Sequence, residues 1–250
     1  MSIQAGDFSY LGVGKVYIRE YGSQAPMLHI GNVSAVDLGV TTESKEQKDY
    51  TTVGGGTVAE VHRISGVELS MTLHDLDKGN ISRAFLGTAS SVAAGTVTNE
   101  AVVAYVGGLI PLMHPVDTTQ TATVVNGATT YVAGDDYELS SGGIIILSGG
   151  DIDDGDTLEV TYTRLAHDNI EAITDNAKEY EICFEGMNEA KDGRPVNVHI
   201  YRTKLSPTDK LSLINDDFAS FTVKSKLLRD NSKSGAGISK YFKTQIVTGE

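Results

Sequence analysis

The segment Val67-Glu68-Leu69-Ser70-Met71-Thr72-Leu73-His74 alternates strictly between apolar and polar side chains. Successive side chains of a β-strand point to opposite faces of the sheet, so this pattern is typical of a strand with one buried face. The same period recurs in residues 15–19, 180–185, 196–200 and 219–224. A helical period of 3.6 residues is convincing only once. The sequence therefore predicts an all-β fold with one short helix.

The predicted helix covers residues 78–86 and follows directly on the strand that decides the fold. Asp77 stands where its carboxylate can accept hydrogen bonds from the free N–H groups of the first turn. Ile81, Ala84 and Phe85 form a narrow apolar stripe. Two to three turns are too short to be stable alone, so we expect the helix to pack on the sheet.

Turn residues connect several of the predicted strands. Asp192-Gly193 lies between residues 180–185 and 196–200 and can supply the positive φ that a tight hairpin requires. Gly12-Val13-Gly14-Lys15 lacks the earlier glycine and the following hydroxyl residue of a phosphate-binding loop, so it is interpreted as the entry to a strand.

The pattern changes between residues 96 and 167, because the alternating strands before and after this stretch resemble one another more than they resemble it. Asn126-Gly127 is predicted to join residues 122–125 to residues 129–132 as a two-residue hairpin, and residues 144–147 and 157–162 indicate further strands. Short strands at this spacing predict a small β-sandwich. The chain is therefore interpreted as a discontinuous main domain, residues 1–95 and 168–250, with residues 96–167 inserted.

Composition excludes several classes of protein. The chain has 250 residues with 33 acidic against 20 basic side chains, a net charge of −13 that repels phosphate groups and argues against tight nucleic-acid binding. Cys183 is the only cysteine, so no internal disulfide is possible. The first residues lack the pattern of a signal peptide, and no apolar run approaches the length of a membrane span. A protein of the reducing cytoplasm is expected.

No motif in the sequence supports catalysis or a cofactor. The run 151–156 lacks the glycine and glutamate positions of a calcium loop, and Asp216-Asp217 has no partner acid or base. Cys183 lacks the surroundings that activate a thiol and is interpreted as structural. We therefore expect no enzyme activity and no cofactor. We also expect no metal site, because the six histidines are spread singly without the spacing of metal ligands: His29, His62, His74, His114, His167 and His199.

Residues 43–57 form the most unusual stretch. They carry mixed charges and end in the run Gly54-Gly55-Gly56 before Thr57, which predicts a loop of about fifteen residues. Loops of this length are usually functional or disordered. Alternating charges suit a partner held in one register, and the alternative is a mobile, solvated loop.

Several segments outside the insert follow one another in a characteristic order, and none of them is catalytic. The segments are Ile30-Gly31-Asn32-Val33-Ser34-Ala35, Lys45-Glu46-Gln47-Lys48-Asp49-Tyr50, Gly54-Gly55-Gly56, Leu73-His74-Asp75-Leu76, Phe184-Glu185-Gly186-Met187-Asn188 and Leu213-Ile214-Asn215-Asp216-Asp217-Phe218-Ala219. By their order along the chain these segments resemble one family, the tail tube proteins, or major tail proteins, of bacteriophages with long non-contractile tails.

The resemblance implies a tail-tube type β-sandwich or barrel, assembled as hexameric rings that stack into a hollow tube through which DNA is ejected. The long loop would reach the adjacent ring, and two strands would join neighbouring subunits into an inner barrel. The loop residues so implied are Lys45, Glu46, Lys48, Asp49, Tyr50, Gly54, Gly55 and Gly56. The inner-barrel residues are Val67, Leu69, Met71, Leu73, Tyr180, Ile182 and Phe184.

The resemblance also implies partners and a location. The chain would contact copies of itself, tail tip and terminator proteins and the tape measure protein, and DNA would pass without specific binding. It would belong to a siphovirus virion, assembled in the host cytoplasm, with no membrane contact. Residues 96–167 would be an immunoglobulin-like decoration on the outer surface. Edge-to-edge pairing in a ring hides strand edges, and a non-closing head-to-tail contact generates a filament.

Other functions remain open at the level of sequence. The tube of a contractile tail or of a type VI secretion system shares the expected fold and would need a sheath. A glycan-binding or adhesive module is a candidate from a different class, motivated by the sandwich-like insert. An enzyme ranks third, because no catalytic constellation is present.

Overall fold

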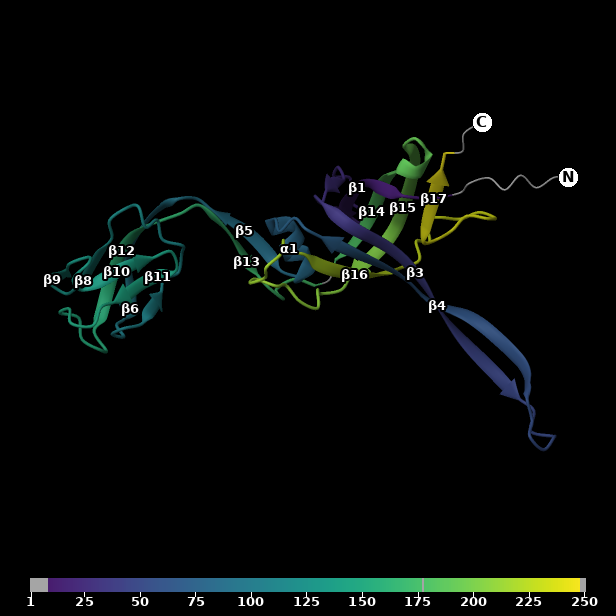
Figure 1. The fold of residues 1–250 in the computed structure, drawn as a ribbon, viewed down its shortest axis with the longest axis horizontal. Coiled ribbons are helices and arrows are strands. Elements are labelled where there is room, and N and C mark those ends of the chain that lie inside the picture. The colour runs from purple at the N-terminus through teal and green to yellow at the C-terminus, as the bar shows by residue number, and fades with distance from the viewer. Residues whose placement is uncertain (1–8, 177, 248–250) are drawn as a thin grey trace. The chain divides into compact units, whose positions relative to one another are not determined.

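The computed structural model describes residues 9–176 and 178–247 and shows a chain built mainly of β-strands (Figure 1). The chain divides into two compact units. The main unit comprises the residues up to Thr88 and those from Ile170 onward, and the inserted unit comprises Ala89–Asn169. These boundaries lie a few residues outside the expected insert, 96–167. The prediction of an all-β chain with a short helix is confirmed.

The main unit contains one open sheet of eight strands. Along the sheet the strands follow the order β2-β1-β14-β15-β16-β4-β3, and β17 also pairs with β15. The strands are β1 (Gly12–Glu20), β2 (Leu28–His29), β3 (Val33–Lys48), β4 (Thr57–Leu73), β14 (Glu179–Asn188), β15 (Arg194–Leu205), β16 (Phe221–Leu227) and β17 (Phe242–Ile246). A short 3-10 helix, η1 (Glu189–Lys191), precedes the turn at Asp192 and Gly193, both of which have positive φ.

Alternating side chains of five strands form the core of the main unit, as the sequence pattern predicts. On β4 the buried residues are Val67, Leu69, Met71 and Leu73. They share one cluster with residues of β1, β14, β15 and β16, namely Val16, Ile18, Ile182, Ile200, Leu205, Phe221, Val223 and Leu227.

The expected barrel is not closed within one chain. Among the described residues, β2 and β3 stand at opposite ends of the strand order and do not pair with each other. These ends differ greatly in length, two residues against sixteen, so they cannot form a continuous ladder. The sheet therefore keeps open edges.

The helix α1 (Lys78–Ala84) begins as predicted. The Asp77 carboxylate accepts hydrogen bonds from the backbone N–H of Gly79 at 2.7 Å and of Asn80 at 3.1 Å. The buried Asn80 amide donates to the carbonyl of Ile30 at 2.9 Å and ties the helix to the sheet. The helix ends earlier than residue 86 because Leu86 has a φ of 49°, outside the helical region.

Gly12-Val13-Gly14-Lys15 lies at the start of β1, which agrees with its interpretation as a strand entry. Gly14 pairs directly with Gly186 of β14. A Cβ on Gly186 would come within 2.3 Å of the Phe184 ring, so the glycine leaves space for that ring.

The inserted unit has two small sheets around its own core. One sheet has the order β6-β12-β8-β9 and the other β10-β11-β7. The strands are β6 (Gly95–Val103), β7 (Leu109–Pro111), β8 (Thr123–Asn126), β9 (Thr129–Tyr131), β10 (Tyr137–Ser140), β11 (Gly143–Ile146) and β12 (Thr157–Arg164). The core includes Tyr137, Ile144, Ile146, Leu158, Val160 and Tyr162.

The turn between β8 and β9 differs by one residue from the prediction. Asn126 pairs with Thr129, so the two turn residues are Gly127 and Ala128. Gly127 has a φ of 58°, which glycine adopts without strain, and this fixes the turn one position later. Where the chain leaves and rejoins the main unit, β5 (Thr88–Val92) and β13 (His167–Glu171) form a two-stranded sheet.

No helix in the described part of the chain is long and apolar enough to cross a membrane.

Candidate assembly interface

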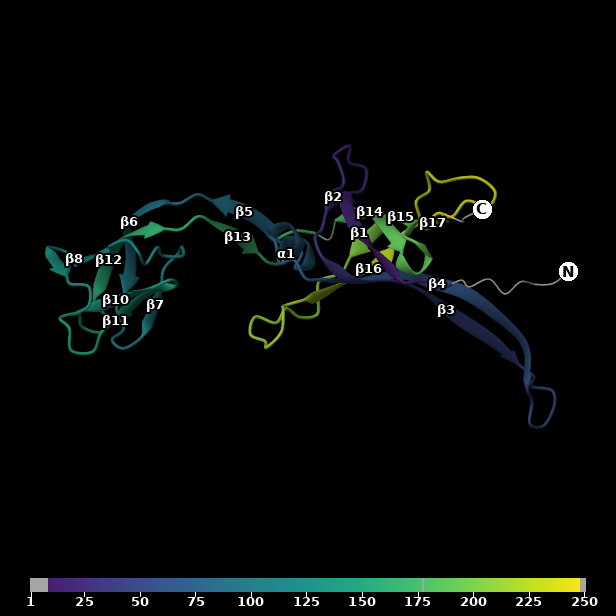
Figure 2. The ribbon, with the colours of Figure 1, turned by 45° about the horizontal axis from the view of Figure 1, so that its top comes forward.

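The outer part of the β3–β4 hairpin extends beyond the rest of the sheet, and we call residues 41–66 the arm (Figures 1 and 2). On β4, pairing with β16 covers Glu68 to Leu73. Towards the tip, the described residues of β4 pair with β3 alone, from Thr41 opposite Gly66 to Lys48 opposite Thr57. The arm is therefore a two-stranded ribbon.

The arm corrects the prediction of a long loop over residues 43–57. Residues 43–48 belong to β3 and Thr57 opens β4, so the connection covers only residues 49–56. Every side chain of residues 41–48 and 57–65 is exposed. Period-two alternation of apolar residues arises where one face of a strand is buried. Neither face of the arm is buried, so residues 43–48 lack the pattern that indicates a strand.

The tip of the arm is an ordered turn around Asp49. Its carboxylate accepts hydrogen bonds from the Thr51 N–H at 2.7 Å and from the hydroxyls of Thr51 and Thr52. These bonds lower the pKa of Asp49 to about 2. The Asp49 N–H donates to the carbonyl of Gly56 at 2.8 Å, and a Cβ on Gly55 would collide with the Asp49 carbonyl. The glycine run thus lets the chain turn back tightly.

Apolar side chains along the arm are open to solvent. Tyr50 at the tip is 87% exposed, and Ile64 near the base is 66% exposed. Val53, Val58 and Val61 are exposed as well. Side chains alternate between the two faces of a strand, so Val61 lies on the opposite face of β4 from Val58 and Ile64. The arm therefore exposes apolar side chains on both of its faces.

Charged side chains face each other across the arm in a fixed register. Glu43 lies opposite Arg63, whereas Glu46 lies opposite Glu60. Opposite charges at paired positions stabilise a ribbon, and like charges destabilise it. The arm thus carries a specific pattern of charges. It includes one pair of opposite charges, Glu43 with Arg63, and one pair of like charges, Glu46 with Glu60.

The loop residues implied by the family resemblance all lie on this arm. Lys45, Glu46 and Lys48 lie on β3, and the others lie at the tip. The tip residues are Asp49, Tyr50, Gly54, Gly55 and Gly56. The exposed Val58, Val61 and Ile64 were missed, and a signal was available: three aliphatic residues directly after a glycine turn.

The residues expected in inner-barrel strands belong to the core of the single chain. Val67, Leu69, Met71, Leu73 and Ile182 are buried, and Tyr180 and Phe184 are half-buried against them. In the sheet β4 and β14 are separated by β15 and β16. Their opposite faces are polar and carry Glu68, Ser70, Thr72, Glu181, Cys183 and Glu185.

Ion pairs cross the polar face of β1, β14 and β15. Glu181 accepts from Arg19 Nε at 2.7 Å and lies 2.5 Å from His199 Nε2. Burial opposes ionisation of Glu181, but the hydrogen bonds from Arg19 and His199 outweigh it and lower the pKa of this carboxyl. Arg202 contacts Glu179 through two nitrogens, at 2.7 and 2.9 Å. This face is a rigid, charged surface.

A second exposed apolar surface lies in the loop of residues 206–220, next to β16 in Figure 2. Leu213, Ile214 and Phe218 are each more than four-fifths exposed. Asp216-Asp217 lies in the same loop, in agreement with its interpretation as part of a turn.

The edge of β3 and the first part of β1, which precedes the pairing of β1 with β2, border an apolar groove of about 270 Å³. Its lining includes Val13, Val16, Val33, Val36, Leu38 and Phe184. Edge strands with free N–H and C=O groups accept further strands, and an apolar groove beside them favours such pairing.

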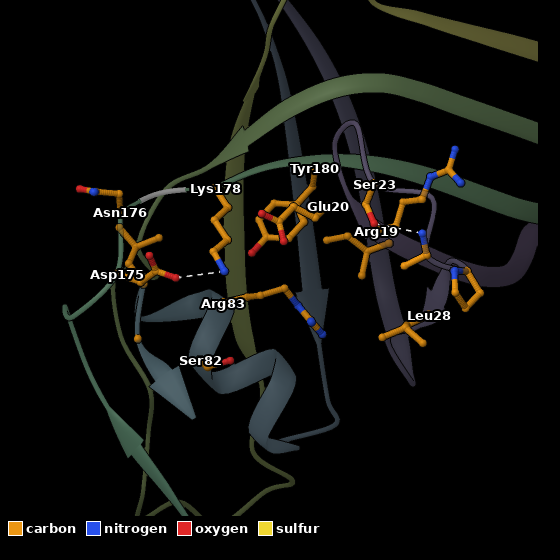
Figure 3. Close-up of a pocket in the computed structure, with 15 residues that line it drawn as sticks. Arg19, Glu20, Ser23, Leu28, Ser82, Arg83, Asp175, Asn176, Lys178 and Tyr180 are labelled. Atoms are coloured by element: carbon orange, nitrogen blue, oxygen red, sulfur yellow. Dashed lines mark hydrogen bonds and ion pairs between the residues drawn. The ribbon is translucent and has the colours of Figure 1, made fainter. Parts of the chain in front are cut away.

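A separate pocket of about 320 Å³ lies between α1, β1 and the segment before β14 (Figure 3). Two of its cations are paired, Arg19 with Glu181 at 2.7 Å and Lys178 with Asp175 at 3.2 Å. Arg83 donates to Asn80 at 2.8 Å, and burial lowers the pKa of Arg83. The described lining residues provide no nucleophile paired with a base, so the pocket offers no support for catalysis.

The described residues hold no group of three or more His, Cys, Asp or Glu side chains that could bind a metal ion.

The fold and its exposed surfaces define an all-β protein with an inserted β unit and a projecting hairpin arm. The chain belongs to the family described as Protein of unknown function UCP028589, whose model matches residues 9–245. No curated protein matches it.

Proposed function

We propose that the chain is a structural subunit that assembles through its arm into a hollow tube, as a tail tube protein of a bacteriophage with a long non-contractile tail. The observation that carries this proposal is the arm itself. Its side chains are exposed on both faces, yet it carries Tyr50, Val53, Val58, Val61 and Ile64.

The energetics of the arm favour a covered state. An isolated two-stranded ribbon is marginally stable in water. Covering apolar side chains contributes about 25 cal/mol per Å² of buried surface, so contact with another subunit stabilises the ribbon and the assembly together. In this proposal the tip contacts a different part of the next copy, so the contact is head-to-tail, and such contacts propagate rings into a filament.

The open sheet supports contacts within a ring. Edge-to-edge pairing between subunits can use the edge of β3 and the first part of β1, together with the groove between them. Such pairing would hide the unpaired backbone groups. In the proposed ring, the strands β4 and β14 contribute to the inner wall with their polar faces. Those faces carry Glu68, Glu181 and Glu185.

The charge of the chain suits a conduit for DNA. Each copy carries a net charge of −13, and a ring multiplies that charge around its opening. Phosphates are repelled by a negative wall, so passing DNA would not adhere to it. The function is passive in this proposal and requires no cofactor. The inserted unit would decorate the outer surface as an immunoglobulin-like domain.

The proposal is tested by shortening the arm without disturbing the sheet. Thr42 and Ile64 are directly paired, so replacing residues 43–63 by Asn-Gly joins them through a two-residue hairpin turn. We expect the purified full-length chain to form rings or tubes of uniform bore under negative stain. The shortened variant should stay folded, by circular dichroism, and form no stacked tubes.

A matched variant distinguishes the effect of the apolar side chains from the effect of the ribbon itself. Val58→Thr, Val61→Thr and Ile64→Thr together keep the strand length and the β-branched shape while removing apolar surface. Tubes should become shorter than those of the unmodified chain. A full-length chain that stays monomeric at high concentration, or a shortened variant with unchanged tubes, would overturn the proposal.

A further inference from the structure

Two histidines that are far apart in the sequence meet in the inserted unit. His114 lies in the loop after β7, and His167 opens β13. His114 Nδ1 lies 3.3 Å from His167 Nε2, and the ring centroids are 5.2 Å apart. The prediction that all six histidines stand singly is therefore wrong for this pair. Sequence spacing does not reveal a contact that the fold creates.

The separation of the two nitrogens matches that of two ligands on one zinc ion. Zn–N bonds are about 2.0–2.1 Å long and the ligands are tetrahedral, which places two ligand nitrogens about 3.3–3.4 Å apart. An ion could therefore bind between His114 and His167 with little rearrangement of either ring.

The protonation of His167 is set by a backbone group. Its Nδ1 lies 2.9 Å from the carbonyl oxygen of Leu165, which can only accept a hydrogen bond. Nδ1 of the neutral ring therefore carries the proton, and the lone pair on Nε2 faces His114 Nδ1, which donates a hydrogen bond to it. A metal ion bound between the rings takes the place of that proton, and His114 then carries its proton on Nε2. Metal-binding histidines commonly donate their other nitrogen to a carbonyl in this way, which fixes the ring orientation.

The loop that carries His114 is held by a chain of hydrogen bonds. The His114 N–H donates to the Tyr162 hydroxyl at 3.2 Å, and that hydroxyl donates to Glu100 at 2.7 Å. Glu100 also accepts from the Met113 N–H at 2.8 Å. Burial and the Glu100 hydrogen bond raise the pKa of Tyr162 to about 12, so the hydroxyl keeps its proton.

A backbone hydrogen bond links the two segments directly beside the histidines. The Leu165 N–H donates to the carbonyl of Pro115 at 3.0 Å. Both rings are half-buried, so solvent can still reach the space between them. The pair is thus supported from both sides and accessible to an ion.

We propose that His114 Nδ1 and His167 Nε2 bind a divalent transition-metal ion of the zinc type. The described residues provide no complete site of three ligands, so water occupies the remaining positions. The bound ion would link the loop after β7 to the start of β13. This role is independent of the proposed tube function.

The test is a calorimetric titration of the full chain with zinc chloride at pH 7.5. We expect the unmodified chain to bind one zinc ion that His114→Gln and His167→Gln each abolish. His62→Gln is the matched control, because His62 is an exposed histidine on the arm. This control should leave the binding unchanged. At pH 5.5 the affinity should fall at least tenfold, because protons compete with the metal ion for the imidazole nitrogens.

A second measurement does not depend on the variants. The zinc K-edge absorption spectrum of the loaded chain should show two imidazole nitrogens and oxygen ligands. The proposal is overturned if the unmodified chain binds no zinc, if both variants keep the site while melting like the unmodified chain, or if the spectrum lacks imidazole ligands.

Discussion

The β3–β4 hairpin joins two regions of opposite character. Near the sheet, β4 buries Leu69 and Met71 almost completely. Further along the same strand, Val61 and Ile64 are more than half exposed, although the backbone pairing with β3 continues. The same secondary structure therefore contributes to the core at its base and is exposed on both faces in the arm, which we propose as a surface for another subunit.

This difference shows which strands can be recognised from an alternation of apolar and polar residues in the sequence. Alternation marks a strand that has one buried face and one solvated face. At the base the pattern is strict, and the strand was predicted from it. In the arm both faces meet solvent, so the composition resembles a loop even though the strands continue. Unpatterned polar residues next to a patterned strand can thus belong to the same hairpin.

The largest expected effect is on the stability of the base. Leu69→Ala removes a side chain that is 1% exposed and should destabilise the main unit by about 2–5 kcal/mol. Val61→Ala, on the exposed part of the same strand, should change the stability of the monomer by less than about 0.5 kcal/mol. Urea unfolding followed by circular dichroism measures both. Equal losses would show that the arm is packed in the monomer.

The second prediction concerns amide hydrogen exchange in the monomer. Amides that pair β4 with β16 should exchange only through large openings, with free energies near that of global unfolding. Amides of the arm between Thr42 and Ile64 should exchange with opening free energies near zero, because no packed side chains hold the ribbon. Tube formation should slow the arm amides and the amides at the free edges of β1 and β3, and should leave those between β4 and β16 unchanged. Strong protection of the arm in a verified monomer would contradict this comparison.

The third prediction uses the charge pairs of the arm. Glu46→Gln removes the repulsion between Glu46 and Glu60 and should stabilise the ribbon by about 0.2–1 kcal/mol. Glu43→Gln removes the attraction to Arg63 and should have the opposite sign. Exchange rates of arm amides at low and high salt provide the measurement. A common sign for the two variants would exclude cross-strand electrostatics as the cause.

The smallest effect is confined to the tip. The pKa of Asp49 is about 2 in the folded chain against an ordinary value of 3.8, because it accepts hydrogen bonds from Thr51 and Thr52. A lowered pKa means that the ionised carboxylate stabilises the tip above about pH 4, and that this contribution is lost as the pH falls towards 2. The NMR titration of Asp49 and of the Thr51 amide should show a midpoint near 2. A midpoint near 3.8 would mean that the turn is not formed in solution, and Asp49→Asn should abolish the transition.

The sequence was informative wherever side chains meet a local requirement. The buried face of β4, the cap of α1 by Asp77 and the strand entry at Gly14 follow from alternation, capping and close backbone approach. The inserted unit was visible because short strands between turn signals replace the alternating strands on either side of it. These features depend on neighbours in the sequence or on one buried face.

Features created by distant contacts were not predictable in the same way. His114 and His167 meet only because the loop after β7 lies beside the segment that leads into β13, where Val116 pairs with Arg164. The groove between β1 and β3 depends on curvature of the whole sheet. The exposure of Phe218 depends on how the loop of residues 206–220 lies on the main unit. Contacts of this kind need the three-dimensional arrangement.

The discontinuity of the main unit also sets the order in which the chain can fold during synthesis. In the sheet β1 pairs with β14, and β4 pairs with β16. The ribosome makes β14 and β16 only after Asn169. Domains generally fold as units while the chain emerges, and pairing across long sequence separations is slow. The inserted unit therefore completes its core first, while the apolar face of β4 waits for its partner. During that interval the nascent chain exposes the apolar face formed by Val67, Leu69, Met71 and Leu73, which the folded sheet buries.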